Sequence, residues 1–146
     1  MKSPIGDSDF CEEEVGKRVD RALHIAREIA KLYKKHCARN LLRYQEGRMG
    51  YIKRTTPVSS CRESLRKFDA GIKEALETIL GRGFTAIEWQ QVVLPVRHGG
   101  IGIRKAEDTA DEAYSASLFA TRSICTELGS WDSQALFSSL MRTNAA

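Results

Sequence analysis

The sequence predicts an all-α fold, an irregular bundle of about five to six helices with a long amphipathic helix at its N-terminal end. Apolar residues recur at steps of three and four over most of the chain, which is typical of helices that bury one face. No segment shows the strict alternation of apolar and polar residues that indicates a half-buried strand. We therefore expect one helical domain over residues 1–128, followed by a helical tail over residues 129–146.

The first two helices are predicted from an apolar stripe and from the charges around it. The longer helix covers about residues 8–36, with acidic residues crowded at its start and basic residues at its end, as the helix dipole favours. A second helix is expected over about residues 38–46, where Gly47 ends it and Gly50 follows. A basic connector over residues 51–57 comes next.

Further helices follow the connector. Thr56 and Pro57 favour the start of a third helix, which runs to about residue 80 and ends at Gly81. Thr85 and Glu88 have the spacing of a capping box, which predicts a short helix to about Val92. A glycine-rich turn then leads to a helix over about residues 106–127, and residues 131–141 form a possible last helix.

Composition agrees with a folded globular protein. Of the 146 residues, 42% are apolar and 29% are charged, which is close to ordinary globular usage. No stretch approaches the roughly 20 apolar residues of a transmembrane helix, and the first ten residues lack the apolar core of a secretory signal. The expectation is an intracellular protein, cytoplasmic or nuclear, that is neither secreted nor bound to a membrane.

Cysteines and histidines give no metal signature. No two cysteines have Cys-x-x-Cys spacing, so we expect small buried side chains rather than disulfides or zinc ligands. The three histidines stand too far apart for a helical metal site. Neither a metal nor a cofactor is expected. The residues concerned are Cys11, Cys37, Cys61, Cys125, His24, His36 and His98.

The net charge of +4 hides a strong asymmetry along the chain. Residues 17–67 contain fifteen Lys or Arg and only four Asp or Glu, whereas residues 68–146 contain seven bases and ten acids. A basic half of this kind favours a polyanionic partner, of which nucleic acid is the commonest. The alternative is a solvated helix surface without a partner, and charge alone does not distinguish the two.

Candidate catalytic chemistry is sparse. Backbone N–H groups of the glycine-rich turn could cradle a phosphate, or an enzyme could use this turn together with His98. However, the turn lacks the Gly-Lys-Ser/Thr of a P-loop and follows no strand, so a structural role for Gly99, Gly100 and Gly102 is favoured. Residues 12–14, three glutamates, are expected to form a solvated first helical turn. We predict no catalytic residue.

Residues 89–104 read WQQVVLPVRHGGIGIR. This segment resembles the signature of tryptophan, then Leu-Pro, then Gly-Gly-Leu-Gly-Leu-Arg in reverse transcriptases of non-LTR retrotransposons, downstream of the polymerase active site. Further blocks resemble that family in the same order, over roughly residues 3–120. These blocks are Ser3-Pro4-Ile5-Gly6, Leu41-Leu42-Arg43-Tyr44, Arg54-Thr55-Thr56-Pro57, Phe68-Asp69, Ile79-Leu80-Gly81 and Ala113-Tyr114-Ser115-Ala116-Ser117.

The resemblance implies the thumb and post-palm C-terminal region of an RNA-directed DNA polymerase. Reverse transcriptases hold two divalent metals on palm aspartates that include an adjacent pair, and this sequence has no adjacent Asp-Asp. Fingers and palm are therefore expected to be missing, with Met1 just after them. The chain could be a fragment, a truncated element or a reused remnant, and we expect no polymerase activity of its own. In that family the thumb grips the template–primer backbone.

Charge and resemblance together predict a non-catalytic helical module that binds an RNA–DNA hybrid or duplex through its backbone. We expect the heads of its basic residues to be solvated, and those on the first two helices and the connector to converge on one end of a helical hairpin. The alternative is a small helical protein–protein interaction domain without a nucleic-acid role. The candidate binding residues are Lys31, Lys34, Lys35, Arg39, Arg43, Lys53, Arg54, Arg97 and Arg104.

Overall fold

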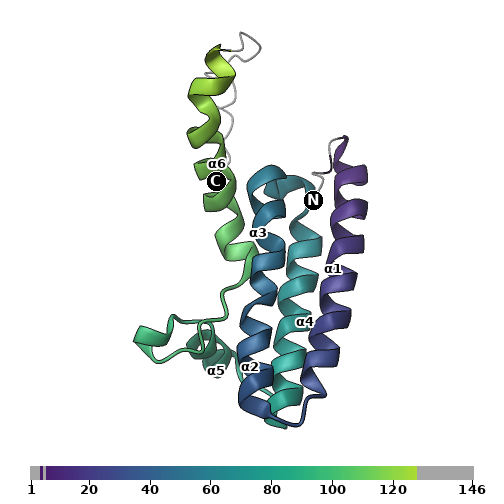
Figure 1. Ribbon diagram of the computed structural model, residues 1–146, viewed down its shortest axis with the longest axis vertical. Helices are drawn as coiled ribbons and strands as arrows, with labels where there is room; N and C mark the ends of the chain where they lie inside the picture. The colour runs from purple at the N-terminus through teal and green to yellow at the C-terminus, as the bar shows by residue number, and fades with distance from the viewer. Residues whose placement is uncertain (1–3, 5, 128–146) are drawn as a thin grey trace.

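Three rods of helix lie side by side in the computed structural model, which describes residue 4 and residues 6–127 (Figure 1). The first rod is α1 (Ser8–Ala30), the second consists of α2 (Lys35–Arg43) followed by α3 (Gln45–Thr55), and the third is α4 (Arg62–Leu80). No strand occurs in these residues, so the predicted all-α fold is confirmed for them.

The remaining elements lie outside the three rods. Helix α6 (Ala106–Glu127) packs its first half on α3 and α4, and its second half extends away from the bundle (Figure 1). The short α5 (Ala86–Val92) and the glycine-rich turn project to one side. Within the described residues, no helix combines the length and apolar character needed to cross a membrane. The predicted tail over residues 129–146 lies outside the described residues.

The second rod corrects two predictions. Gly47 does not end a helix, and residues 51–57 do not form a connector, because α3 continues to Thr55. The backbone of Tyr44, with φ −74° and ψ −12°, passes almost directly from α2 into α3. Buried side chains explain this continuation, since they recur at steps of four and three along the whole rod. They are Ala38, Leu42, Gln45, Met49, Ile52 and Thr56.

The burial of these side chains, here called the apolar seam, stabilises the helix by more than the glycines destabilise it. A glycine in a helix interior costs about 1 kcal/mol relative to alanine, whereas burying a Met or Ile side chain contributes about 1.5–3 kcal/mol. Met49 and Ile52 are both fully buried. They therefore keep α3 helical through Gly47 and Gly50.

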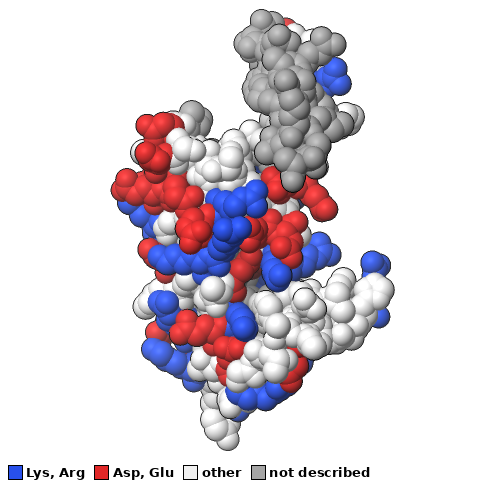
Figure 2. All heavy atoms as spheres, turned by 180° about the vertical axis from the view of Figure 1, so that it is seen from behind, with Lys and Arg blue, Asp and Glu red and all other residues white. Residues whose placement is uncertain are grey.

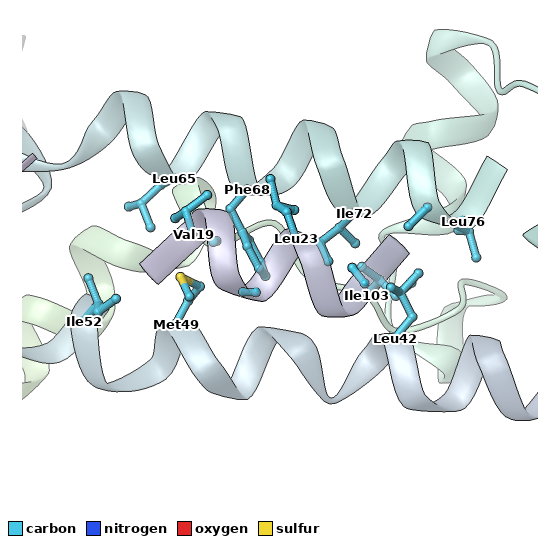
Figure 3. Packing of buried hydrophobic residues seen from close by; sticks show 14 of the residues in the cluster. Val19, Leu23, Leu42, Met49, Ile52, Leu65, Phe68, Ile72, Leu76 and Ile103 are labelled. Carbon is cyan, nitrogen blue, oxygen red and sulfur yellow. The ribbon is translucent and has the colours of Figure 1, made fainter. Parts of the chain in front are cut away.

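The core lies where the three rods meet (Figure 3). In this view α1 contributes Val19 and Leu23, and Met49 points toward them from α3. The α4 side chains enter from the opposite side, with Phe68 near the centre. Each of the three rods thus buries one stripe against the other two, which is the arrangement that their apolar spacing predicts.

The helix ends differ from the predictions in two places and agree in a third. Helix α1 ends at Ala30 rather than near residue 36, and residues 31–34 turn the chain into α2. Thr56 caps no helix: it is buried, and a short 3-10 segment, η1 (Val58–Ser60), precedes α4. The capping box at α5 is confirmed, because Thr85 and Glu88 exchange both hydrogen bonds. The Thr85 N–H and Arg82 together lower the pKa of Glu88 to about 2.

The cysteines Cys11 and Cys61 are free and buried, as predicted, and Cys37 is free and half-buried. Burial raises the pKa of the Cys61 thiol to about 12, so this thiol stays protonated at neutral pH. The side chain of Cys125 lies outside the described residues.

Candidate nucleic-acid interface

A row of residues with arginines at its ends runs along α2 and α3. Arg39, Arg43, Gly47, Gly50 and Arg54 follow one another at steps of four, four, three and four, which places them on one face of the continuous rod. The three arginines are exposed. At 1.5 Å of rise per residue, about 16 Å of helix axis separates Arg43 from Arg54.

The exposed cations of this rod differ from many others in the protein. On α1 and α4, Lys17 pairs with Glu13 and Glu14, and Lys67 pairs with Asp20 at 2.7 Å. Among the described residues, no ion pair joins a carboxylate to the exposed predicted binding residues of the second rod and of the turn just before it. These residues are Lys34, Lys35, Arg39, Arg43 and Arg54. Their charge is available to an external anion.

Lys53 does not belong to this exposed set, which corrects the prediction that its head is solvated. Only 5% of Lys53 is exposed. Its Nζ donates to Oε1 of Glu46 at 3.0 Å and to Oγ1 of Thr109 at 2.8 Å. Because α3 is helical up to Thr55, position 53 faces α6 rather than solvent. Lys53 thus ties α3 to α6 inside the protein.

Lys31 is exposed but already paired. Its Nζ lies 2.6 Å from Oε1 of Glu28, one turn earlier in α1. The hydrogen bond and charge of Lys31 lower the pKa of Glu28. Lys31 therefore offers an external anion less net charge than the unpaired cations of the second rod.

The basic residues also do not converge on one end of the bundle. Lys34 and Lys35 lie at the turn between α1 and α2, whereas Arg54 lies near the far end of α3 (Figure 1). Arg54 follows Lys35 by 19 positions, which corresponds to about 28 Å along the rod. The predicted cluster at one end is wrong because the predicted connector is helical. The charges are spread along the rod instead.

A hollow of about 390 Å³ opens between α3 and α6. It brings together Arg54 and Arg104, two predicted binding residues that are 50 positions apart in the sequence. The guanidinium of Arg43 lies beside the glycine-rich turn, with Nη2 3.3 Å from the point that a Cβ at Gly102 would occupy. The lining of the hollow comprises Glu46, Gly47, Gly50, Lys53, Arg54, Arg104, Thr109, Glu112 and Ala113.

The glycine-rich turn has a structural role. Gly99 and Gly102 have φ of 80° and 77°, values that favour glycine. A Cβ at Gly100 would overlap the carbonyl oxygen of Leu94. The favoured structural role of these glycines thus has two physical reasons, positive φ and close approach of the backbone.

The amides of this turn are already used. The N–H groups of residues 99–102 donate to the carbonyl oxygens of Val96, Pro95, Val92 and Leu94, at 2.9–3.3 Å. A phosphate cradle needs free N–H groups that point outward. The turn therefore holds its own backbone in place instead of offering these amides to an anion. Arg97, also a predicted binding residue, is exposed, and its Nε lies 3.1 Å from Nε2 of His98.

Two carboxylates have roles that the sequence analysis missed, because each caps a helix distant in sequence. Oε1 of Glu12 accepts a hydrogen bond from the N–H of Ser64 in the first turn of α4, at 2.7 Å. Asp69 accepts from the N–H groups at the start of α6. For α6 the signal in the sequence was the lack of a local cap, because Lys105 precedes this helix and is not a good N-cap residue. For α4 no such signal existed, because Thr56 and Pro57 favoured a helix start upstream of Cys61.

Charge on the face shown in Figure 2 is mixed. Blue and red side chains alternate over the bundle, and the projecting part that holds α5 is mostly uncharged. The described residues contain no group of three or more His, Cys, Asp or Glu placed to hold a metal ion. A scan against protein-family models and searches of curated proteins and solved structures give no match to this chain.

Proposed function

We propose that this chain is a helical nucleic-acid-binding module that contacts the sugar–phosphate backbone of a template–primer duplex, such as an RNA–DNA hybrid. The observation that carries the proposal is the set of unpaired cations along the second rod. The resemblance to the thumb of non-LTR retrotransposon reverse transcriptases supports the same partner. In this proposal the module has no polymerase activity of its own.

The physical basis is the release of counterions from the nucleic acid. Each phosphate that Lys or Arg neutralises releases condensed cations, so affinity falls as salt concentration rises. Arginine also matches phosphate oxygens with two parallel hydrogen bonds. Contacts of this kind position a protein on a duplex without reading its sequence. We therefore expect all sequences to bind about equally.

The decisive experiment measures affinity for a labelled RNA–DNA hybrid at several salt concentrations. With about five phosphates engaged, log affinity should fall against log salt with a slope of roughly −3.5 to −4.5. The double change Arg39→Ala and Arg43→Ala should make that slope shallower, reducing its magnitude by about one to two units. Because exposed charges contribute little to stability, the thermal unfolding midpoint should hardly change.

The matched control is Lys17→Ala with Lys67→Ala. It removes the same formal charge from α1 and α4, where both lysines are ion-paired. The slope should then change by less than about half a unit. An affinity that ignores salt, or an equal loss in the control, would overturn the proposal and favour the protein–protein interaction domain.

A further inference from the structure

Gly47 and Gly50 have no steric reason to be glycine. Neither has a positive φ, and a Cβ at either position would meet no heavy atom within 4 Å. Gly71 on α4 is different, because its Cβ would overlap the side chain of Leu23. A larger residue at position 47 or 50 would favour the helix. These two glycines weaken α3 without improving its packing, and they keep open the hollow that they line.

The hollow between α3 and α6 is lined by several charged residues. Arg54 and Arg104 line it, and neither has an ion pair with the described residues. Lys53 and Glu46 also face it but neutralise each other at 3.0 Å. Glu112 is the other acidic residue in the lining. The hollow therefore carries a net positive charge.

Arg43 extends this positive surface toward the glycine-rich turn. It stands four residues before Gly47, on the same face of the rod. About 16 Å of helix axis runs from Arg43 to Arg54. A nucleic-acid strand carries one phosphate per nucleotide, so this length is long enough for a few consecutive phosphates of one strand. A volume of about 390 Å³ lies at the small end of ligand sites, so the hollow is too small to enclose a whole duplex.

We propose that this hollow is the site where one sugar–phosphate strand of the bound nucleic acid lies, with Arg43, Arg54 and Arg104 contacting its phosphates. The inference rests on the proposed function and adds its location. The bare backbone at Gly47 and Gly50 lets the strand approach the helix closely. Glu112 opposes the strand through like-charge repulsion and limits its affinity.

The test fills the hollow without weakening the helix. Gly47→Leu and Gly50→Leu place bulky side chains in the hollow and replace a poor helix former with a good one. The unfolding midpoint should stay equal or rise, while affinity for a 20-base-pair RNA–DNA hybrid at low salt should fall about tenfold or more. Gly83→Leu is the matched control: its Cβ would make only ordinary van der Waals contact with Glu77, and affinity should not change.

Charge variants test the same site without adding bulk. Arg104→Ala should lower affinity several-fold and reduce the salt slope by about one unit. Glu112→Gln should raise affinity several-fold, because it removes the like charge. If Gly47→Leu, Gly50→Leu and Glu112→Gln all bind as the wild type does, the strand does not lie in the hollow.

These results separate the site from the function. Wild-type binding that is salt-dependent and weakened by Arg39→Ala with Arg43→Ala, but unaffected by filling the hollow, would overturn the site and leave the proposed function standing. A wild-type protein without salt-dependent affinity for the hybrid would overturn both. Loss of binding in the filled variants with an unchanged unfolding midpoint would support both.

Discussion

Asp69 on α4 caps a helix that begins 37 residues later, because its Oδ1 accepts the backbone N–H of Ala106 at 2.6 Å. Its Oδ2 accepts the N–H of Glu107 at 3.0 Å. The carboxylate of Glu107 in turn binds Arg66 at 2.9 Å and Arg62 at 3.2 Å. The start of α6 is thus fastened to α4, which fixes one wall of the hollow between α3 and α6.

Removing this cap should loosen α6. Asp69→Ala leaves two N–H groups at the helix start without their acceptors, and loss of an N-cap typically costs about 1–2 kcal/mol. The free energy of unfolding in urea should fall by this amount. Hydrogen exchange should show the loss at the amides of Ala106 and Glu107 first. Unchanged protection at both amides would contradict the capping role.

The pH dependence of this cap has an unusual sign for a carboxylate. Burial raises the pKa of Asp69 above its ordinary value of 3.8, and the two backbone hydrogen bonds oppose that shift only in part. A raised folded-state pKa means that the folded protein binds the proton more tightly than the unfolded chain does. The contribution of Asp69 to the free energy of unfolding is therefore fully present below pH 3.8 and declines as pH rises through the folded-state pKa. The stability difference between wild type and Asp69→Asn should therefore be larger at pH 3.5 than at pH 7. The reverse order would show that hydrogen bonding to the ionised form outweighs burial.

Lys53 should be a stability residue rather than a binding residue. Removing one partner of a buried ion pair lowers the free energy of unfolding by about 3–5 kcal/mol. For Lys53→Ala we expect a smaller loss of about 2–3 kcal/mol, because Glu46 is partly exposed. The salt slope of nucleic-acid binding should not change. Arg54→Ala provides the contrast: it should leave stability nearly unchanged and lower the slope by about one unit. A large change of the salt slope in Lys53→Ala, measured at a temperature where the variant is folded, would show that Lys53 contacts the nucleic acid.

Gly100→Val should destabilise the glycine-rich turn. The new side chain would force apart the backbone of Gly100 and Leu94, at a cost of about 1–3 kcal/mol, the scale of backbone strain at such sites. Urea unfolding measures this cost. Unchanged stability together with lost nucleic-acid binding would instead indicate that the turn contacts phosphate.

Glu12 and Glu13 should behave differently although they are neighbours. Glu12→Ala removes the cap on the Ser64 N–H of α4 and should cost about 1 kcal/mol. Glu13→Ala removes only an exposed pair with Lys17 and should change stability by less than about 0.5 kcal/mol. Equal effects of the two changes would show that Glu12 does not act as a cap.

The purified chain should extend no primer on an RNA template in magnesium or manganese. The reason lies in the sequence, which has no adjacent aspartate pair to hold two divalent metals. Radiolabelled nucleotide incorporation measures this directly. Template-dependent incorporation above a control without protein would contradict the prediction.

Helices whose signals are local were predicted correctly from the sequence. The apolar stripe of α1, the capping box at Thr85 and the helical spacing within α6 all depend on residues within a few positions of one another. The glycine-rich turn belongs with them. Its positive φ values at Gly99 and Gly102 are a property of the local backbone.

The continuation of the second rod required the tertiary structure, although its pattern was in the sequence. Met49 and Ile52 stand at helical spacing from Leu42, but Gly47 and Gly50 gave a stronger local signal for a helix end. Only burial against α1 and α4 gives the apolar seam a stabilising free energy larger than the helix-propensity cost of the two glycines. The exposure of Lys53 was mispredicted for the same reason.

The sequence by itself determined the fold class, the helices with regular apolar stripes, the structural turn and a basic half suited to a polyanion. Only the tertiary structure decided which cations stay available, because Lys53 is buried while Arg54, its neighbour, is exposed. It also decided that Glu12 and Asp69 cap helices 52 and 37 residues away. Spacing in sequence reports only contacts within one helix, whereas the caps and the hollow arise between helices that folding brings together.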